Sequence, residues 1–201
     1  MKKVLMSLLV CLMVYSFTAT SALSEEGMYV SGNVGYAMLS DSDGSFDGDT
    51  GNASFDDGYV GTLALGYGLS DKFRVEGEIG YQKNDFNKGT NSEGTEDLSD
   101  FDVSSTSFLV NGYYDFANKS SFTPFLTAGA GVANVEVSGF GADVDDTVFA
   151  YQLGAGVGYA VTTNTNLDLK YRYFATEDVE HAGAEAEYAS HNIYLGLRYN
   201  F

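Results

Sequence analysis

Four aspartates stand close together in the stretch DSDGSFDGD, at positions 41 to 49: Asp41, Asp43, Asp47 and Asp49. Carboxylate oxygens are hard ligands of the kind that calcium binds in proteins. The spacing is not that of an EF-hand, and the bidentate glutamate that ends such a loop is missing. The four are therefore weak candidates for a metal site, beside the alternative of a solvated acidic segment, and we expect no cofactor.

Ser190 and His191 are a second set of residue types that could do chemistry, as a nucleophile and its base. Such a pair must lie within hydrogen-bonding distance. The two are adjacent in a stretch that alternates between apolar and polar residues, and neighbours on a strand point to opposite faces. The sequence therefore predicts that the chain is not an enzyme.

Charged residues of both signs alternate with apolar residues in several other stretches. Because successive residues of a strand alternate between its two faces, these charges share the face that is not apolar. They are Arg74, Glu76, Glu78, Asp115, Asp168, Lys170, Arg172 and Arg198. Charges in a confined space persist only when they are paired and hydrogen-bonded. We expect Glu76 and Glu78 to pair with Lys170 and Arg172, with Arg198 one strand further on.

The elements that would position these residues are eight strands. Period-two alternation recurs along the chain, which has 24 glycines, 15 tyrosines and one proline. The expected strands lie near residues 28–39, 59–69, 73–83, 104–116, 122–135, 148–161, 165–175 and 188–201. The pattern predicts an all-β fold.

The connections between these strands alternate between short and long. Short turns are expected at 70–72, 117–121 and 162–164, and long polar links at 40–58, 84–103, 136–147 and 176–187. In an up-and-down arrangement the two kinds lie at opposite ends. The long links carry most of the 28 acidic residues, and like-charged polar runs usually stay unstructured. We expect a solvated, mobile acidic fringe at one end.

Alternation fits both a soluble barrel with an apolar interior and a membrane barrel with an apolar exterior. Three features favour the membrane barrel. The polar face is rich in glycine and mixed charges but poor in the lysines that protect a solvated sheet. Tyrosine and phenylalanine gather toward the ends of the apolar face, as in aromatic girdles. The loop lengths follow the pattern of outer-membrane barrels.

The N-terminus has the pattern of a secretory signal peptide. Lys2 and Lys3 precede an apolar run from Val4 to Phe17, and small residues follow. We expect a signal peptide over residues 1–24, with cleavage near 22–24, followed by one domain over 25–201. The net charge of −18 argues against binding to nucleic acid, which needs a basic face.

From about Gly27 to Phe201 the chain resembles the small outer-membrane β-barrels of the opacity-protein and surface-antigen families. The stretches that carry this resemblance are GMYVSGNVGY, FRVEGEIGY, TPFLTAGAGVA, AYQLGAGVGYAVTTNTNLDLKYRYF and LGLRYNF. It implies an eight-stranded antiparallel up-and-down transmembrane β-barrel with short periplasmic turns and four long extracellular loops. It also implies that Tyr199 and Phe201 form the signal read by the outer-membrane assembly machinery.

The expected location is the outer membrane of a Gram-negative bacterium, and the expected role is structural, as a surface antigen or adhesin acting through the acidic loops. The alternatives are a narrow porin with a charge-gated lumen and an enzyme that modifies lipid A. Resemblance to lipid A deacylases would need His and Ser two residues apart, a spacing that this chain lacks. Expected partners are outer-membrane lipids, lipopolysaccharide, the assembly machinery and a host or environmental surface ligand.

Overall fold

The computed structural model describes most of the chain after residue 26. The described residues are 27–40, 42–46, 49–55, 57–91, 94–97, 102–139, 142–177, 179–181, 184–186 and 188–201. The expected signal peptide, residues 1–24, lies outside them. Among the described residues, none belongs to a helix with the length and apolar character needed to cross a membrane.

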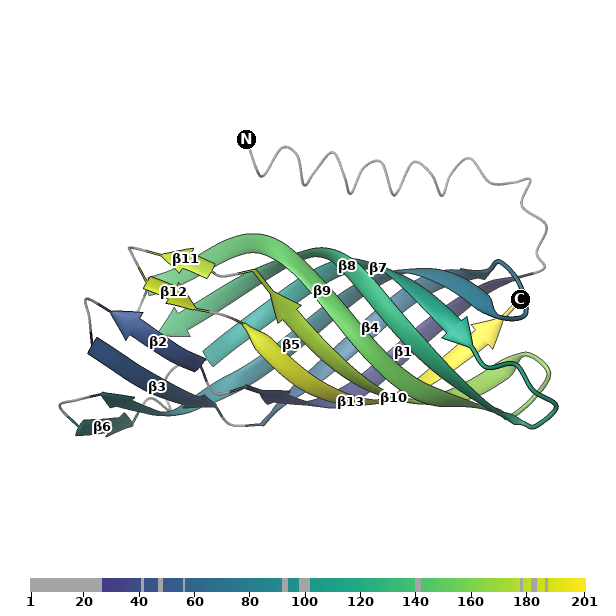
Figure 1. Cartoon of the computed structure of the whole chain (residues 1–201), viewed down its shortest axis with the longest axis horizontal. Coiled ribbons are helices and arrows are strands. Elements are labelled where there is room, and N and C mark those ends of the chain that lie inside the picture. The colour runs from purple at the N-terminus through teal and green to yellow at the C-terminus, as the bar shows by residue number, and fades with distance from the viewer. Residues whose placement is uncertain are drawn as a thin grey trace.

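Eight antiparallel strands form a closed ring (Figure 1). They are β1 (Met28–Leu39), β4 (Gly58–Gly68), β5 (Phe73–Asn91), β7 (Asp102–Asp115), β8 (Phe122–Gly139), β9 (Ala142–Ala160), β10 (Thr165–Thr176) and β13 (Ala189–Asn200). Each pairs with the next, and β13 pairs back onto β1, with Val34 opposite Leu195. The predicted eight-stranded up-and-down barrel is therefore confirmed.

Closure of the ring explains how this sheet can lie in hydrocarbon. A bilayer offers no hydrogen-bond partner to a free backbone N–H or C=O, so a spanning sheet must have no open edge. The β1–β13 pairing removes the edge. Just past the C-terminal end of β13, the Phe201 N–H donates to the Met28 carbonyl over 3.0 Å and extends this pairing. The first and last strands thus seal the barrel.

Alternation along each strand decides which side chains face outward. In β5 the side chains of Arg74, Glu76 and Glu78 are buried, whereas Val75 and Ile79 between them are 40% and 45% exposed. The other ring strands repeat this pattern. The apolar face therefore points away from the barrel axis, as in a membrane barrel and opposite to a soluble one.

Aromatic residues gather in two belts on the outer surface. One includes Phe73 and Tyr114, with ring centroids 5.2 Å apart, and the other includes Tyr59 and Tyr81, at 6.4 Å. Aliphatic side chains such as Leu63 and Ile79 lie between the belts. At ~3.3 Å per residue the belts are about 26 Å apart along a strand, or roughly 20 Å along the barrel axis after tilt. This matches an outward apolar band flanked by aromatic girdles.

The two ends of the barrel differ, and we name them by their connections. At the turn end, tight turns join the strands, as where the Leu69 N–H donates to the Phe73 carbonyl over 2.8 Å. Gly27, with a φ of 106°, leads the chain into β1 at this end, and its carbonyl accepts a hydrogen bond from the Gly68 N–H. A side chain at position 27 would be strained there.

The hairpin end, on the left of Figure 1, corrects the expectation of unstructured links. β5 continues to Asn91, β8 continues to Gly139, and β9 already begins at Ala142. Shorter strands add to this end: β2 (Ser42–Phe46), β3 (Asp49–Phe55), β6 (Gly94–Asp97), β11 (Val179–His181) and β12 (Ala184–Ala186). β2, β3 and β6 build onto β5, while β11 and β12 pair with each other. Most of the described residues in the long connections are thus strand.

Candidate functional site

The barrel lumen is the candidate site, because it gathers the charged residues that the sequence analysis singled out. All eight point inward. Seven of them are buried, and the Arg198 side chain is 12% exposed. They come from four ring strands, β5, β7, β10 and β13, and each reaches the lumen because it occupies an inward position of the alternation.

Arg74 and Asp115 form a bidentate ion pair near the turn end. Arg74 Nε donates to Asp115 Oδ2 over 2.6 Å, and Nη2 donates to Oδ1 over 2.9 Å. The guanidinium carbon lies 4.3 Å from the centroid of the Tyr113 ring, and Nη1 donates to the Tyr29 hydroxyl over 3.2 Å. Planar pairing and stacking together fix the guanidinium in place.

Asp168 and Arg198 form a second pair near the turn end, between the neighbouring strands β10 and β13. Arg198 Nε and Nη2 donate to the two Asp168 oxygens over 3.1 and 3.3 Å. Gly158 on β9 leaves room for them. A Cβ there would lie 2.7 Å from Asp168 Oδ1 and 3.2 Å from Arg198 Nη2.

Glu78 joins opposite walls of the barrel. Its Oε1 accepts a hydrogen bond from Arg172 Nη1 over 2.8 Å, and its Oε2 lies 3.8 Å from Lys170 Nζ. The ring of Tyr194 lies beneath both cations, 4.6 Å from the Arg172 guanidinium carbon and 5.0 Å from Lys170 Nζ. One carboxylate thus ties β5 to β10 across the lumen.

Glu76 does not pair as expected. Its Oε1 accepts a hydrogen bond from the Tyr113 hydroxyl over 2.9 Å, and its Oε2 accepts one from Ser31 over 3.3 Å. Among the described residues no cation lies within ion-pair distance of it. Arg198, also expected near Glu76 and Glu78, bonds to Asp168 instead. Hydroxyls on β7 and β1 therefore replace the cation expected opposite Glu76, while Arg198 bonds to the neighbouring strand β10.

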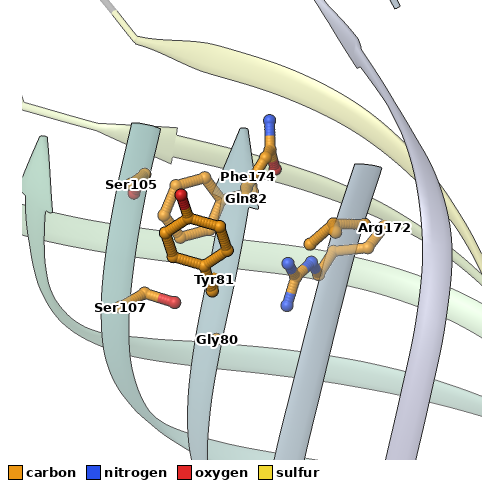
Figure 2. Close-up of a pocket in the computed structure, with 8 residues that line it drawn as sticks. Gly80, Tyr81, Gln82, Ser105, Ser107, Arg172 and Phe174 are labelled. Atoms are coloured by element: carbon orange, nitrogen blue, oxygen red, sulfur yellow. The ribbon is translucent and has the colours of Figure 1, made fainter. Parts of the chain in front are cut away.

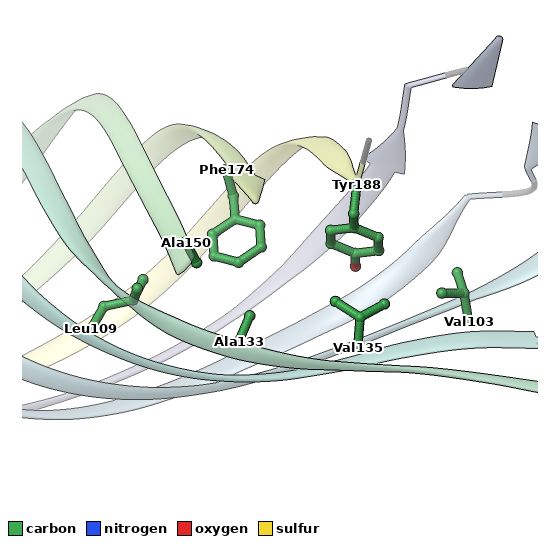
Figure 3. Packing of buried hydrophobic residues seen from close by; sticks show 7 residues of the cluster. All are labelled: Val103, Leu109, Ala133, Val135, Ala150, Phe174 and Tyr188. Carbon is green, nitrogen blue, oxygen red and sulfur yellow. The ribbon is translucent and has the colours of Figure 1, made fainter. Parts of the chain in front are cut away.

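The lumen toward the hairpin end contains a cluster of apolar side chains, which the sequence analysis missed (Figure 3). The cluster, called here the apolar plug, consists of Val103, Leu109, Ala133, Val135, Ala150, Phe174 and Tyr188. The Phe174 and Tyr188 rings meet edge to face at 6.1 Å. Burial raises the pKa of the Tyr188 hydroxyl, so that it stays protonated. The alternation of the sequence does indicate this cluster, because Phe174 lies on the same strand face as Arg172, and Leu109 on the same face as Asp115.

Ser190 and His191 lie on opposite sides of the barrel wall. Ser190 is fully buried in the lumen, where its Oγ donates to Gln82 Oε1 over 3.3 Å. His191 is on the outer surface, with its Nδ1 2.6 Å from the Tyr171 hydroxyl and its ring stacked on Tyr171. These two side chains therefore cannot act as a nucleophile and its base.

The remaining predicted residues are placed only in part. Asp41 and Asp47, and the side chains of Asp43 and Asp49 in β2 and β3, lie outside the described part of the structure. Within the described part no cluster of three metal-ligating side chains occurs. Tyr199 and Phe201 face outward at the turn end, 44% and 58% exposed, with their rings 5.6 Å apart.

Comparison with known families gives one match over nearly the whole chain. Residues 7–201 match the model of the outer membrane protein beta-barrel domain. The outer membrane protein PagN of Salmonella typhimurium is 30% identical, over 94% of this chain and 95% of PagN. A putative adhesin of Rickettsia conorii, RC1281, is 28% identical over 74% of this chain and 70% of its own length.

Among solved structures, Neisserial surface protein A is similar with a TM-score of 0.59 and 24% identity, over 88% of this chain and 98% of that one. The outer membrane protein OprG of Pseudomonas aeruginosa follows the same fold with a TM-score of 0.55 and 16% identity, over 87% and 97% of the two chains. These likenesses concern the fold, a closed barrel of eight antiparallel strands in the outer membrane.

Proposed function

The chain belongs to the outer membrane protein beta-barrel domain family, and we propose that it is a non-conducting, non-enzymatic surface protein that acts through its acidic hairpin end. On this view the barrel anchors and orients the hairpins. Recognition, in the manner of a surface antigen or adhesin, takes place outside the membrane.

The observation that carries this proposal is the filling of the lumen. Eight strands leave an interior that side chains nearly fill. Here ion pairs occupy the part toward the turn end, and the apolar plug occupies the part toward the hairpin end. A continuous water path would have to cross both. The filled lumen supports an anchor and weighs against the narrow porin that the sequence left as an alternative.

The position of the belts supports an outward-facing hairpin end. In barrels of this kind the short turns lie in the periplasm and the longer connections outside the cell. Beyond the belt that contains Tyr59 and Tyr81, β5, β8 and β9 continue toward Asn91, Gly139 and Ala142. These extensions would stand clear of the bilayer and present their side chains to the surroundings.

Acidic residues give this end its character. Glu136 on β8 stands directly opposite Asp145 on β9, and Asp146 follows. Like charges in direct opposition are unfavourable on a sheet, so such a pair suits a role in contact with a partner or with counter-ions. Proposed partners are a host or environmental surface, lipopolysaccharide and its bound cations, and the assembly machinery through Phe201. The kinship with a putative adhesin supports the first of these.

The absence of catalysis is part of the same proposal. It rests on Ser190 and His191, which face opposite sides of the wall. Mass spectrometry of lipid A from cells that overproduce the chain tests this directly. An unchanged lipid A mass is expected, and a new acyl or head-group species would overturn it.

Adherence of intact cells tests the surface role. A Gram-negative host that carries the chain is expected to bind cultured epithelial cells or extracellular matrix better than the same host without it. Replacing Asp143, Asp145 and Asp146 by Asn should remove that gain. Asp71→Asn, the same change in an exposed turn at the other end, is the matched control and should leave it intact. Equal adherence of all four strains would contradict the proposal.

A further inference from the structure

A small cavity lies inside the barrel where the charged part of the lumen meets the apolar part. Its lining includes Val60 of β4, Gln82 of β5, Ser105 and Ser107 of β7, and Arg172 and Phe174 of β10. Figure 2 shows the two serines on one side and Arg172 on the other. Its volume, measured with a water-sized sphere, is about 10 Å³. That is about the least that holds one water molecule.

Two polar atoms of this lining make no hydrogen bond of normal geometry to the described residues: Arg172 Nε and Ser105 Oγ. The Tyr188 hydroxyl lies close to Ser105, and it also lacks a hydrogen bond of normal geometry. Arg172 and Ser105 are only 2% and 3% exposed. The Arg172 guanidinium cannot turn to satisfy Nε elsewhere, because its Nη1 is held by Glu78. A buried donor without a partner is costly, so a ligand that accepts from Nε would stabilise the fold.

The chemistry of the lining restricts what that ligand is. Arg172 Nε can only donate, and the serine hydroxyls can donate or accept. The ligand must therefore accept from Nε and can donate to a hydroxyl oxygen. The four basic and four acidic side chains of the lumen balance one another, so no further anion is needed. The small volume admits a single non-hydrogen atom.

We propose that this cavity is a binding site for one structural water molecule, held between Arg172 Nε and Ser105 Oγ. The water completes the hydrogen bonding of Arg172 and keeps its guanidinium on Glu78. It also connects the ion pairs to β7, at the boundary with the apolar plug. This site is independent of whatever the hairpins bind.

Gly80 on β5 keeps the site open. A Cβ at this position would lie 2.7 Å from Ser107 Oγ and 3.5 Å from Thr62 Cγ2. A methyl group there would push the Ser107 hydroxyl toward the cavity. Gly80→Ala is therefore expected to expel the water without removing any polar group from the lining.

High-resolution crystallography of the folded protein tests the proposal. Wild type is expected to show a density peak within hydrogen-bonding distance, about 2.7–3.2 Å, of both Arg172 Nε and Ser105 Oγ. The peak should vanish in Ser105→Val, whose methyl groups fill the space, and in Gly80→Ala. Thr127→Val is the matched control, because it also removes a buried, unpartnered hydroxyl from the lumen but lies outside the lining of this cavity. The peak should persist there.

Three outcomes would overturn the proposal. The first is an empty cavity in wild type. The second is an anomalous signal at the site in crystals grown with bromide, which would identify a halide. The third comes from urea unfolding in lipid vesicles, where Ser105→Val is expected to lower the midpoint below that of the control. A raised midpoint would show that the cavity is dry and simply gains from being filled.

Discussion

The two parts of the lumen solve the same packing problem in opposite ways. Toward the turn end, Arg74, Asp115, Asp168 and Arg198 fill the space as hydrogen-bonded ion pairs. Toward the hairpin end, Leu109, Phe174 and Tyr188 fill it as a water-soluble protein fills its core. The apolar outer band surrounds the charged part of the lumen. At this level the outside of the wall faces lipid, so polar side chains must point into the lumen. The apolar part continues beyond the belt that contains Tyr59 and Tyr81, where the wall no longer faces hydrocarbon.

The two parts of the lumen therefore differ in the kind of substitution that destabilises them. In the charged part, stability depends on complete pairing, because removing one partner leaves a buried charge without an ion pair. In the apolar part it depends on volume, because a smaller side chain leaves a cavity. The following predictions separate these two dependences.

Glu78→Ala is expected to have the largest effect. It leaves Arg172 and Lys170, both buried, without their shared carboxylate. Removing one partner of a buried pair costs about 3–5 kcal/mol. Urea unfolding in vesicles, followed by the heat-modifiable shift on gels, measures the loss. Asp102→Asn is the control, since the Lys83–Asp102 pair is about one-third exposed and should be worth less than about 1 kcal/mol. Equal effects of the two variants would mean that the cross-lumen pair contributes little.

Leu109→Ala tests the apolar plug. The side chain is 2% exposed, and its truncation should cost roughly 2–4 kcal/mol through lost burial and the remaining cavity. Leu63→Ala is the matched control, because Leu63 is 67% exposed on the outer face and packs against lipid. The same unfolding assay applies. A smaller loss at position 109 than at position 63 would contradict a packed interior at the hairpin end.

Arg74→Lys should have the smallest effect of the three, about 1–2 kcal/mol. The charge is kept, but the bidentate geometry with Asp115 and the stacking on Tyr113 are lost. If lysine supported the same unfolding midpoint as arginine, charge alone would account for this pair. The planar contacts would then be incidental.

Much of the barrel could be predicted from period-two alternation, because lipid on one side and the lumen on the other force each residue to choose a face. The hairpins could not. β5 beyond Gln82 reads KNDFNKGTN, which has no apolar face. A strand that continues outside the bilayer does not need one, because it has no lipid to face. There the strands are paired through backbone hydrogen bonds. These bonds do not depend on side-chain type, so the sequence pattern does not reveal them.

Faces were also easier to predict than partners. Alternation places Glu76 inside, but only the register shows the Tyr113 hydroxyl beside it and the nearest cations held elsewhere. A prediction from charge alone assigns a cation to each carboxylate, whereas hydrogen bonds from two hydroxyls also stabilise a buried carboxylate. The same alternation that places the charges in the lumen also places Phe174 and Leu109 there, because they share a strand face with Arg172 and Asp115.

Single-channel recording in planar bilayers tests the central claim most directly, because the claim is that both parts of the lumen are closed. Folded wild-type protein is expected to give no current steps, and Glu78→Gln, which breaks one closure while the apolar plug remains, should also be silent. Steady wild-type steps whose size changes in Glu78→Gln would contradict the account. They would identify the chain as a narrow porin.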